Sequence, residues 1–502
     1  RGYDNFEINM NTALILKNIE DYNSSILYFI KAFKNQPKNP DPLIALSSVY
    51  IQINDTKNAL KYCINAASLR PNDANLLCNL AMLYKSDGNN SMAIKQLSKA
   101  LLILPESYAA LTNLANLMEE EDQLDQAIEL YQEAYRINNR DPLIICNLAS
   151  AFLVKGFLDK SIDLYRKALA INHNNVEANW GLSQVLLLQG NYNYGLVHYE
   201  WRLNKEKPLI LNYLPIPSMW KGDFSSLNKE LLVICEQGLG DTIHFSRYLI
   251  PLIEKGINVI LYCPEKLAEL LNFSFEGIQI VTKLDEVKNK NMQWIHLISL
   301  LRHLDVSTTK PLIQYPYIKV NKKYIDRWKG KFDSITSPVI GLNWQGNPLT
   351  EVSNLKGRSI KLKSIEPLIN KEGFIFISLQ KGYGSEQFNE CAFKHKFVDF
   401  QDDISNTMDF CSTAGIIHLC DIIITVDTVV AHLAASMGKR TWLLLHKVPD
   451  WRWGMTGNTS FWYPSLTLFR QKDFNSLEQS ILEVSNQMDL YKHSYNSKYE
   501  LN

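Results

Sequence analysis

A glycine-rich turn that carries an acidic residue stands directly after a short apolar run in the middle of the chain. The stretch ICEQGLGDTIHF, residues 234–245, contains Gly238, Gly240 and Asp241. Glycines allow a tight turn and a close approach of the backbone to another group. An aspartate at the start of the following helix is either a helix cap or, in a cleft, a general base. Both roles for Asp241 stay open at this point.

Two familiar nucleotide-binding motifs are incomplete in this turn. A dinucleotide fingerprint needs a third glycine at position 243, which is Ile243, although Glu265 follows the next expected strand, where a ribose-binding acid would stand. A P-loop needs Gly-Lys-Ser/Thr, and no lysine follows the two glycines before Lys255. We therefore expect this turn on the acceptor side of a cleft.

A second turn between a strand and a helix is a better nucleotide site. The stretch VDTVVAHLAASMGKRTWLLL, residues 426–445, predicts a strand, then Asp427 and Thr428 at the turn, then a helix that carries His432. The first N–H groups of a helix lack partners and favour negative charge, so this turn is a candidate site for phosphate or diphosphate. Thr428 can donate to a phosphate oxygen. His432 lies about one turn along the helix, and a buried, hydrogen-bonded histidine is the alternative for it.

Polar and basic residues follow other expected strands. Gln380 and Lys381 end one of them, and the loop GRSIKL, residues 357–362, brings Arg358 and Lys361 towards the same edge. A guanidinium can pair with two phosphate oxygens at once. These four side chains are candidates for binding the nucleotide part of a donor, and a solvated loop charge is the alternative for Arg358.

The elements that must position these residues read as alternating strands and helices. Short apolar runs form two series: 230–236, 258–263, 278–281 and 294–300, then 339–344, 374–380, 421–426, 441–446 and 466–469. Such runs predict parallel sheets covered on both faces. Ligands of open α/β sheets bind at the carboxyl ends of the strands, where the candidate residues stand. We expect residues 321–338 to link the two sheets.

The first two fifths of the chain carry an internal repeat. Four units begin at Ala45, Asn79, Asn113 and Asn147, each 34 residues after the last. Small residues recur in register at Ser47, Ala81, Ala115 and Ala149, and again at Ala66, Ala100, Ala134 and Ala168. This spacing resembles the tetratricopeptide repeat, a pair of antiparallel helices that stacks into a superhelix and commonly binds extended polypeptide. We expect a partial unit before Asp41 and a divergent one over about 176–201.

One polar residue recurs with the repeat. Asn79, Asn113 and Asn147 take equivalent positions on the first helix of successive units, which face the inner groove in tetratricopeptide arrays. Each amide both donates and accepts, so such a ladder can bind the backbone of an extended peptide. The protein O-linked N-acetylglucosamine transferases carry a comparable ladder, and this resemblance implies peptide capture. The alternative is that these asparagines cap or bridge neighbouring helices.

The composition is that of an ordinary globular protein. The chain has 502 residues, 46% hydrophobic and 21% charged, and its 52 basic and 52 acidic residues cancel, so no basic excess argues for nucleic acid. The longest apolar runs are far shorter than the ~18 residues that span a bilayer. Eight scattered cysteines lack zinc-like spacing, and we expect free thiols in a reducing cytoplasm. The chain begins with Arg1 rather than Met, which leaves a removed targeting segment open.

The motifs, taken in order, resemble one family. The stretches EQGLGDTIHFSRYL, GLNWQGNP with GRSIKL, SLQKG, DTVVAHLAASMGK and PDWRWGMTGNTSFWYPSLTLFRQ are similar to those of the bacterial tetratricopeptide-fused glycosyltransferases. The catalytic half of that family is similar to the ADP-heptose:lipopolysaccharide heptosyltransferases. The resemblance implies a GT-B fold of two Rossmann-like domains and an inverting transfer from a nucleotide-activated sugar.

The family's site residues fall on matching positions of this sequence. The base falls on Asp241, with Gly240 and His244 on the acceptor side. The donor-binding residues fall on Asp427, Thr428, His432, Arg358 and Lys361. The long repeat array is a departure from the lipopolysaccharide enzymes and favours a protein acceptor. Several relatives with this arrangement modify flagellin, which puts flagellin or another surface protein among the candidate acceptors.

Three further expectations concern the second half. No Asp-x-Asp occurs in the chain, so the usual carboxylate pair for a diphosphate-bound metal ion is missing, and helix amides and basic side chains would stabilise the leaving group. The aromatic stretch 448–464 is equally suited to stacking on a base or sugar and to core packing. Residues 477–491 predict a helix, and in GT-B folds such a helix often crosses back to the first domain.

The sequence thus predicts an all-α tetratricopeptide superhelix followed by an α/β GT-B fold of two Rossmann-like doubly wound domains. We expect the boundaries 1–203, 204–325, 326–475 and 476–502. The predicted function is a cytoplasmic, metal-independent, inverting glycosyltransferase that moves a sugar from a nucleotide-sugar, its co-substrate, to Ser/Thr hydroxyls of a protein. The alternatives are a heptosyltransferase acting on a glycan or lipid-linked acceptor, and a tetratricopeptide scaffold with an inactive transferase half.

Overall fold

The chain divides into two compact units, which are described separately. The computed structural model describes residues 5–205, 218–227, 230–287, 292–307, 309–312, 314–351, 357–474 and 476–499. Residues 1–155 and 159–178 form the first unit, and residues 156–158 and 179–502 form the second.

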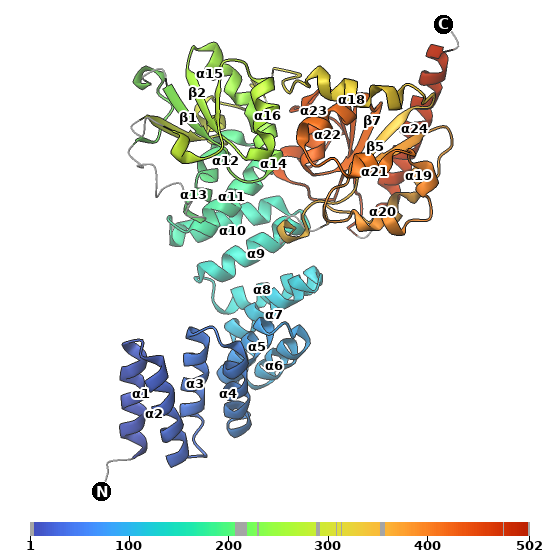
Figure 1. Cartoon of the computed structure of the whole chain (residues 1–502). Helices are drawn as coiled ribbons and strands as arrows, with labels where there is room; N and C mark the ends of the chain where they lie inside the picture. The colour runs from blue at the N-terminus through green and yellow to red at the C-terminus, as the bar shows by residue number, and fades with distance from the viewer. Residues whose placement is uncertain are drawn as a thin grey trace. The chain divides into compact units, whose positions relative to one another are not determined.

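The first unit is a series of antiparallel helix pairs, as the repeat spacing predicts (Figure 1). Its helices are α1 (Phe6–Asn18), α2 (Tyr22–Asn35), α3 (Asp41–Gln52), α4 (Thr56–Leu69), α5 (Ala74–Ser86), α6 (Asn90–Ile103), α7 (Tyr108–Glu120), α8 (Leu124–Ile137), α9 (Pro142–Lys155) and α10 (Leu158–Ile171). The recurring small residues are all buried, which lets the two backbones of each pair approach closely.

The expectation of a partial unit before Asp41 is wrong, because α1 and α2 form a complete pair. The small residues that join these two helices are Ala13 and Ser25, both 0% exposed, and the Ser25 hydroxyl donates to the Ala13 carbonyl at 2.8 Å. The same bond joins Ser47 to the Ala59 carbonyl in the next unit, at 2.9 Å. The first pair therefore uses the contact of a regular repeat.

Helix α11 (Val176–Leu188) crosses from the first unit into the second, which continues with α12 (Tyr192–Tyr199) and α13 (Arg202–Lys205). Two parallel sheets follow. The first has the strand order β3-β2-β1-β4 and the second has the order β6-β5-β7-β8-β9. The strands are β1 (Glu230–Ile234), β2 (Asn258–Tyr262), β3 (Gln279–Val281), β4 (Gln293–His296), β5 (Val339–Asn343), β6 (Ile375–Ser378), β7 (Ile422–Val426), β8 (Thr441–Leu445) and β9 (Leu466–Arg470).

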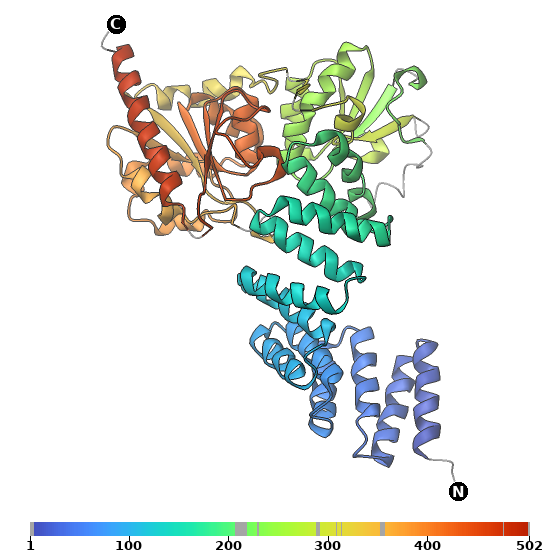
Figure 2. The same ribbon diagram turned by 180° about the vertical axis from the view of Figure 1, so that it is seen from behind.

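Helices connect and cover these strands, as the alternation predicts (Figures 1 and 2). They are α14 (Leu239–Phe245), α15 (Ile250–Glu254), α16 (Glu265–Ser274), α17 (Leu300–His303), α18 (Lys322–Phe332), α19 (Glu366–Ile369), α20 (Glu386–Glu390), α21 (Gln401–Ser405), α22 (Phe410–Leu419), α23 (Val429–Ser436) and α24 (Glu478–Tyr499). All nine expected strands are present, and the second half has the architecture of two Rossmann-like domains.

Two details differ from the sequence expectations. The apolar run 294–300 is only partly a strand: β4 ends at His296 and α17 starts at Leu300, since a buried apolar run suits either element. The expected linker 321–338 contains α18, whose Trp328 and Phe332 are buried four residues apart, as on one face of a helix. This helix packs on α22, where Gly415 lies so close to α18 that an added Cβ would come within 2.5 Å of a Tyr324 carbonyl oxygen.

The last helix, α24, lies along the second sheet (Figure 2). It contacts β9 and α19, and Lys371 beside α19 pairs with Asp489 at 2.5 Å. Val484 and Met488 of α24 are fully buried in the core of this sheet. These contacts join α24 to the second domain, and the return to the first domain stays a prediction.

Candidate active site

The turn after β1 holds Asp241 at the start of a helix. Gln237 takes the left-handed conformation, with φ of +62°, and Gly238 then precedes α14. The Gly238 N–H donates to a carboxylate oxygen of Asp241 at 3.0 Å. Asp241 therefore makes the contact expected of a residue that caps its own helix. Its role as a general base stays a prediction.

The second glycine of this turn brings the two sheets' domains together. A Cβ added at Gly240 would lie 2.9 Å from Cδ2 of His432 and 3.5 Å from the Cα of Val429. Helix α14 thus packs directly on α23, the helix that follows β7. The two turns that sequence patterns single out, about 190 residues apart, meet at this contact. Gly240 serves this close packing, and its contact with an acceptor stays a prediction.

Arg452 joins the two turns electrostatically. It lies in a short 3-10 helix, Trp451–Trp453, and its guanidinium forms ion pairs with Asp241 and, at 2.7 Å, with Asp450. Only 8% of the Arg452 side chain is exposed, so both pairs are largely shielded from solvent. Sequence reasoning missed Arg452. The available signal was a single charge between two tryptophans, since a buried charge needs a partner.

The carboxyl groups beside Arg452 have perturbed acidities. Burial raises the pKa of Asp241, and the Arg452 charge opposes that rise. Burial and the nearby Asp450 charge raise the pKa of Asp427 to about 6, against the opposing charge of Arg358. Carboxyl groups with raised pKa values at a junction of two sheets are typical of sites that bind charged ligands or move protons.

The ends of three strands in the second sheet are joined by side-chain hydrogen bonds. The Thr428 hydroxyl donates to the Asn343 side-chain oxygen at 2.6 Å, and the Asn343 amide donates to Gln380 at 2.8 Å. Gln380 also accepts from the backbone of Trp344 and Gln345, both at 3.0 Å. Gln380 is 4% exposed, so it fixes the edge of the sheet rather than offering a free amide. Its expected contact with a donor stays a prediction.

Two buried histidines share one tyrosine hydroxyl. Nδ1 of His244 lies 2.7 Å and Nδ1 of His432 lies 2.9 Å from the Tyr463 oxygen. Burial lowers the pKa of both histidines well below the usual range, so both are neutral. Each Nδ1 either accepts the phenol hydrogen or donates its own to the phenol oxygen, so the tautomers of both rings depend on where Tyr463 directs its hydrogen. Nε2 of His432 lies 3.9 Å from Asp427.

The remaining donor candidates lie in different surroundings. Arg358 is largely buried and lies 3.5 Å from Glu351, and its charge opposes the raised pKa of Asp427. The Lys381 ammonium donates to the Ile404 carbonyl, and burial lowers its pKa to about 8. Lys361 is exposed at the start of a short 3-10 helix. Arg358 therefore belongs with the Asp427 cluster, whereas Lys361 has no described side-chain contact with it.

The aromatic stretch 448–464 packs into the core, which was one of its two expected roles. Trp451, Trp453, Trp462 and Tyr463 are each at most 4% exposed. Trp453 stacks on His432 with ring centroids 5.4 Å apart, and the Trp462 N–H donates to the Arg452 carbonyl at 2.9 Å. These rings therefore pack against α23, which follows the Asp427–Thr428 turn, and fix the Arg452 backbone.

The three asparagines of the repeat lie on α5, α7 and α9 of the first unit. Asn79 is exposed, and Asn113 and Asn147 are half-buried. The Asn147 amide donates to the side-chain oxygen of Asn116 at 3.2 Å, which also accepts from Tyr131 at 2.5 Å. Asn147 thus bridges two helices, as the alternative interpretation predicts. Peptide binding by the three asparagines stays a prediction.

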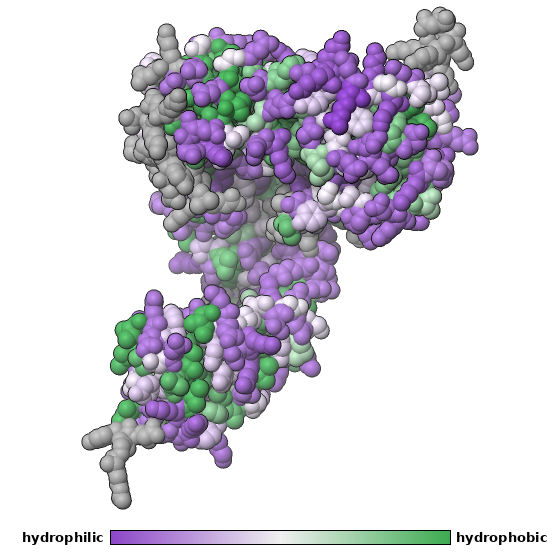
Figure 3. Space-filling view, viewed as in Figure 1, coloured by the Kyte–Doolittle hydropathy of each residue, from purple (hydrophilic) through white to green (hydrophobic). Residues whose placement is uncertain are grey.

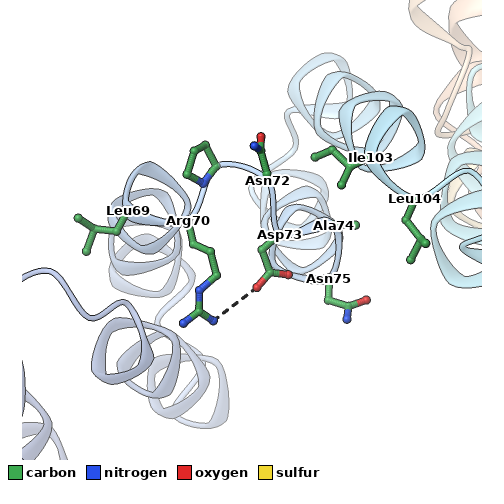
Figure 4. A pocket seen from close by; sticks show the side chains of 9 residues that line it. Leu69, Arg70, Asn72, Asp73, Ala74, Asn75, Ile103 and Leu104 are labelled. Carbon is green, nitrogen blue, oxygen red and sulfur yellow. Dashed lines mark ion pairs between the residues drawn. The ribbon is translucent and has the colours of Figure 1, made fainter.

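The first unit also has an open hollow of about 600 Å³ (Figure 4). It lies where α4, the start of α5 and the end of α6 meet, and Arg70 pairs with Asp73 in it at 3.5 Å. Leu69, Ile103 and Leu104 give it an apolar lining. Figure 3 shows further apolar side chains on the surface of the first helices. Ile15 of α1 and Leu27 of α2 are each 61% exposed. Exposed apolar and amide groups of this kind suit contact with polypeptide.

Two features are absent from the described residues. In that part of the chain, no group of three or more His, Cys, Asp or Glu side chains could hold a metal ion. None of the helices described in the structure combines the length and the apolar character that crossing a membrane requires.

Comparison with known proteins identifies the repeats. Residues 41–73 and 78–142 match tetratricopeptide-repeat models. Protein FlbA of Caulobacter vibrioides is 20% identical over 334 residues, which cover 60% of this chain and 53% of FlbA. The chain therefore spans about half the length of this curated relative.

Solved structures similar to this chain include tetratricopeptide proteins. A MamA protein is 20% identical, covers 34% of this chain and 94% of its own, and has a TM-score of 0.31. PilF of Pseudomonas aeruginosa is 17% identical and has a TM-score of 0.36, and the match covers 41% of this chain and 94% of PilF. YrrB, described as a tetratricopeptide protein with an unusual peptide-binding site, is 17% identical, covers 36% and 94%, and has a TM-score of 0.31. Residues 41–73 and 78–142 of the chain therefore carry tetratricopeptide repeats, and its second half contains two parallel α/β sheets.

Proposed function

We propose that this protein is an inverting glycosyltransferase that moves a sugar from a nucleotide-sugar to a Ser or Thr hydroxyl of a protein. The observation that carries the proposal is the meeting of two strand-to-helix turns: Asp241 of the first sheet's domain is paired to Arg452 beside the Asp427–Thr428 turn of the second. A transfer between two substrates needs a base and an anion site within reach of each other. Here both stand at carboxyl ends of parallel strands.

The reaction needs three movements of charge. Asp241 accepts the proton of the acceptor hydroxyl, and the oxygen attacks the anomeric carbon from the face opposite the phosphate. The bond between that carbon and the phosphate oxygen breaks, so the nucleotide leaves with its electron pair and the sugar is inverted. The leaving phosphate gains negative charge, which the first N–H groups of α23 and Arg358 are suited to stabilise. The Thr428 hydroxyl donates to Asn343 and must exchange that bond to take part.

The repeat array is the proposed acceptor site. Tetratricopeptide arrays bind extended polypeptide, and Asn79 and Asn113 leave amides at the surface of successive units. We propose a cytoplasmic reaction, because nucleotide-sugars are made there; the eight cysteines are all free thiols, which agrees with a reducing compartment. Flagellin or another surface protein is the candidate acceptor on the resemblance described above.

One observation favours a non-catalytic scaffold instead. Both oxygens of Asp241 are engaged within the protein, one by the Gly238 N–H and the other by Arg452. A carboxylate held in this way is a good structural link between two domains. A base must exchange one of these contacts for an acceptor hydroxyl.

Nucleotide binding and turnover separate the two functions. We expect thermal stabilisation by at least one of ADP, UDP, GDP, CDP and CMP, and slow hydrolysis or transfer from the matching nucleotide-sugar. Asp241→Asn keeps the Gly238 contact, so it should retain nucleotide binding and lose transfer by about 10²-fold or more. Nucleotide binding without turnover of any donor would support the scaffold. Failure of every nucleotide to bind would remove the transferase proposal.

A further inference from the structure

We infer that the last helical turns before the first sheet, α12 and α13 (residues 192–205), position the candidate active site and are not part of the peptide-binding array. The evidence is that these two helices hold both segments that meet there: the loop that carries Asp241 and the aromatic stretch that carries Arg452. The catalytic readout of this inference rests on the proposed function, whereas its structural readout does not. Both helices and both segments belong to the second compact unit.

The first hold is a buried ion-pair cluster around Arg202. The Arg202 guanidinium donates to both carboxylate oxygens of Glu236, at 2.6 and 3.1 Å, in the forked geometry that fixes direction as well as distance. It also donates to Glu200 at 2.7 Å and to the Ser299 hydroxyl at 2.8 Å. Ser299 lies between β4 and α17 of the first sheet's domain. Arg202 is 6% exposed. Glu236 is therefore fixed five residues before Asp241.

The second hold acts on the next residue of the same loop. The Tyr199 hydroxyl and the Gln237 side-chain amide lie within 3.2–3.3 Å of each other. Gln237 is the residue with φ of +62°, a conformation that costs a non-glycine residue free energy and persists where its surroundings enforce it. Helices α12 and α13 thus grip two consecutive residues at the start of the glycine-rich turn.

The third hold is aromatic and acts on the other side of the site. The Tyr192 ring, 2% exposed, makes edge contacts with Trp451, Phe461 and Trp462, with centroids 5.9, 5.7 and 5.8 Å away. Trp451 directly precedes Arg452 and also contacts Tyr199 at 5.8 Å. Aromatic pairs of this geometry add to the free energy of burial and fix ring positions.

These contacts close a ring. From α12 and α13 the contacts pass through Glu236 and Gln237 to Asp241, through the ion pair to Arg452, and through Trp451 back to Tyr192. Helices α12 and α13, most of which the sequence analysis assigned to the repeat array, thus lie in this closed path of contacts opposite the ion pair of Asp241 and Arg452. Loosening it should let the Asp241 loop and the Arg452 segment separate, and misplacement of about 1 Å is enough to lower a rate about 10²-fold.

The test compares Arg202→Gln, Arg202→Lys and a matched control in the full-length chain. Lys371→Gln removes a cation that is 18% exposed and pairs with Asp489 away from the site, so it controls for loss of a partly buried ion pair. Backbone hydrogen exchange followed by mass spectrometry reports on each segment without any substrate. We expect Arg202→Gln to speed exchange about tenfold or more in residues 236–245 while α3 to α8 stay unchanged, and Arg202→Lys to show a smaller effect.

The aromatic hold is tested separately with Tyr192. Tyr192→Phe keeps the ring and its edge contacts but loses the buried hydroxyl, so Tyr192→Ala should speed exchange over residues 448–464 more than Tyr192→Phe does. In the transferase assay, Arg202→Gln and Tyr192→Ala should each lower kcat by about tenfold or more. The KM for the protein acceptor should change little, because α12 and α13 are not where the peptide binds.

The outcomes decide the inference independently of the proposed activity. Unchanged exchange of residues 236–245 in folded Arg202→Gln, or the same change in Lys371→Gln, would overturn it. A raised acceptor KM with unchanged kcat would assign α12 and α13 to the array instead. If wild type transfers no sugar, the proposed function fails, and the exchange data still decide whether these helices position the two segments.

Discussion

The Arg452 guanidinium is ion-paired with the Asp241 carboxylate, a residue 211 positions earlier in the chain. This pair unites the two halves of the second unit at the point where their chemistry-bearing turns meet. Arg452 also pairs with Asp450, and its guanidinium lies 5.1 Å from the Phe245 ring centre, so it is held from several sides. The charge balance at the proposed base is therefore set by a residue that the sequence does not single out as a site residue.

Replacing Arg452 should change the pH dependence of transfer. Burial raises the pKa of Asp241 and the Arg452 charge lowers it, so Arg452→Gln removes the lowering influence and the pKa rises further. Because the base must be ionised, kcat/KM falls as pH drops through this pKa. The acid limb of the kcat/KM profile should then move to higher pH.

Arg470→Gln is the matched control for that profile. Arg470 donates to the carbonyls of Trp453 and Gly457, each at 2.6 Å, so it supports the same segment without pairing to a carboxylate. Arg470→Gln should lower activity without moving the acid limb. An acid limb that stays in place in Arg452→Gln would show that Asp241 is not the titrating group.

Gly240→Ala should destabilise the second unit. The new methyl carbon would stand 2.9 Å from His432 Cδ2, so α14 and α23 must separate, at a cost of about 1–3 kcal/mol. The control is Gly330→Ala in α18, where an added Cβ meets nothing within 4 Å and a helical alanine gains up to about 1 kcal/mol. All 10 tryptophans follow residue 178, so tryptophan fluorescence during urea unfolding reports on the second unit. Equal unfolding free energies for wild type and Gly240→Ala would contradict the close packing.

What the sequence could predict was local. The strands, the glycine-rich turn after β1 and the Asp427–Thr428 turn each depend on a few consecutive residues, and parallel sheets bring such turns to one edge. The repeat was equally readable, because its small residues recur at a fixed spacing. Even the expected linker carried its helix signal, the pair Trp328 and Phe332 at a spacing of four.

What the sequence could not predict was pairing between distant segments. Asp241 as a base and Asp241 as a cap look the same in sequence, and its partner Arg452 is visible only in three dimensions. Gln380 ends a strand, as a ligand-binding residue would, but its amide turns inward to Asn343. Tyr463 was part of an aromatic stretch, and nothing local indicates that its hydroxyl lies between His244 and His432.

The contribution of Asp427 to the stability of the second unit should fall as pH rises through the titration of this residue. Its pKa is about 6 in the folded protein against 3.8 for a free side chain, so between these values the folded state binds more protons than the unfolded state. Stability is therefore greatest below about pH 4 for this group and is lost as pH rises past about 6, by about 3 kcal/mol at most.

Asp427→Asn removes this dependence and should gain stability relative to wild type at pH 7 but not at pH 4. Urea unfolding monitored by tryptophan fluorescence measures the difference. Gly330→Ala, which changes no titratable group, is the control and should keep the wild-type dependence on pH. A constant difference between Asp427→Asn and wild type from pH 4 to pH 7 would rule out the raised pKa.

The asparagines of the repeat should separate into two classes. Asn147→Ala breaks the bond to Asn116 and leaves the Asn116 oxygen with Tyr131, so it should lower the stability of the first unit by about 1 kcal/mol. Asn79→Ala with Asn113→Ala removes amides at the surface of the array. This double variant should raise KM for a protein acceptor and leave donor hydrolysis unchanged.

Asn65→Ala is the control, since Asn65 is exposed on α4, the second helix of its pair. It should match wild type in both assays. The first unit lacks tryptophan, so its unfolding is followed by far-ultraviolet circular dichroism. Tryptophan fluorescence identifies the part of the circular dichroism change that belongs to the second unit. A KM that is unchanged in Asn79→Ala/Asn113→Ala would remove the amide ladder from the acceptor site, and the apolar surface of the first helices would then be the region to test for peptide binding.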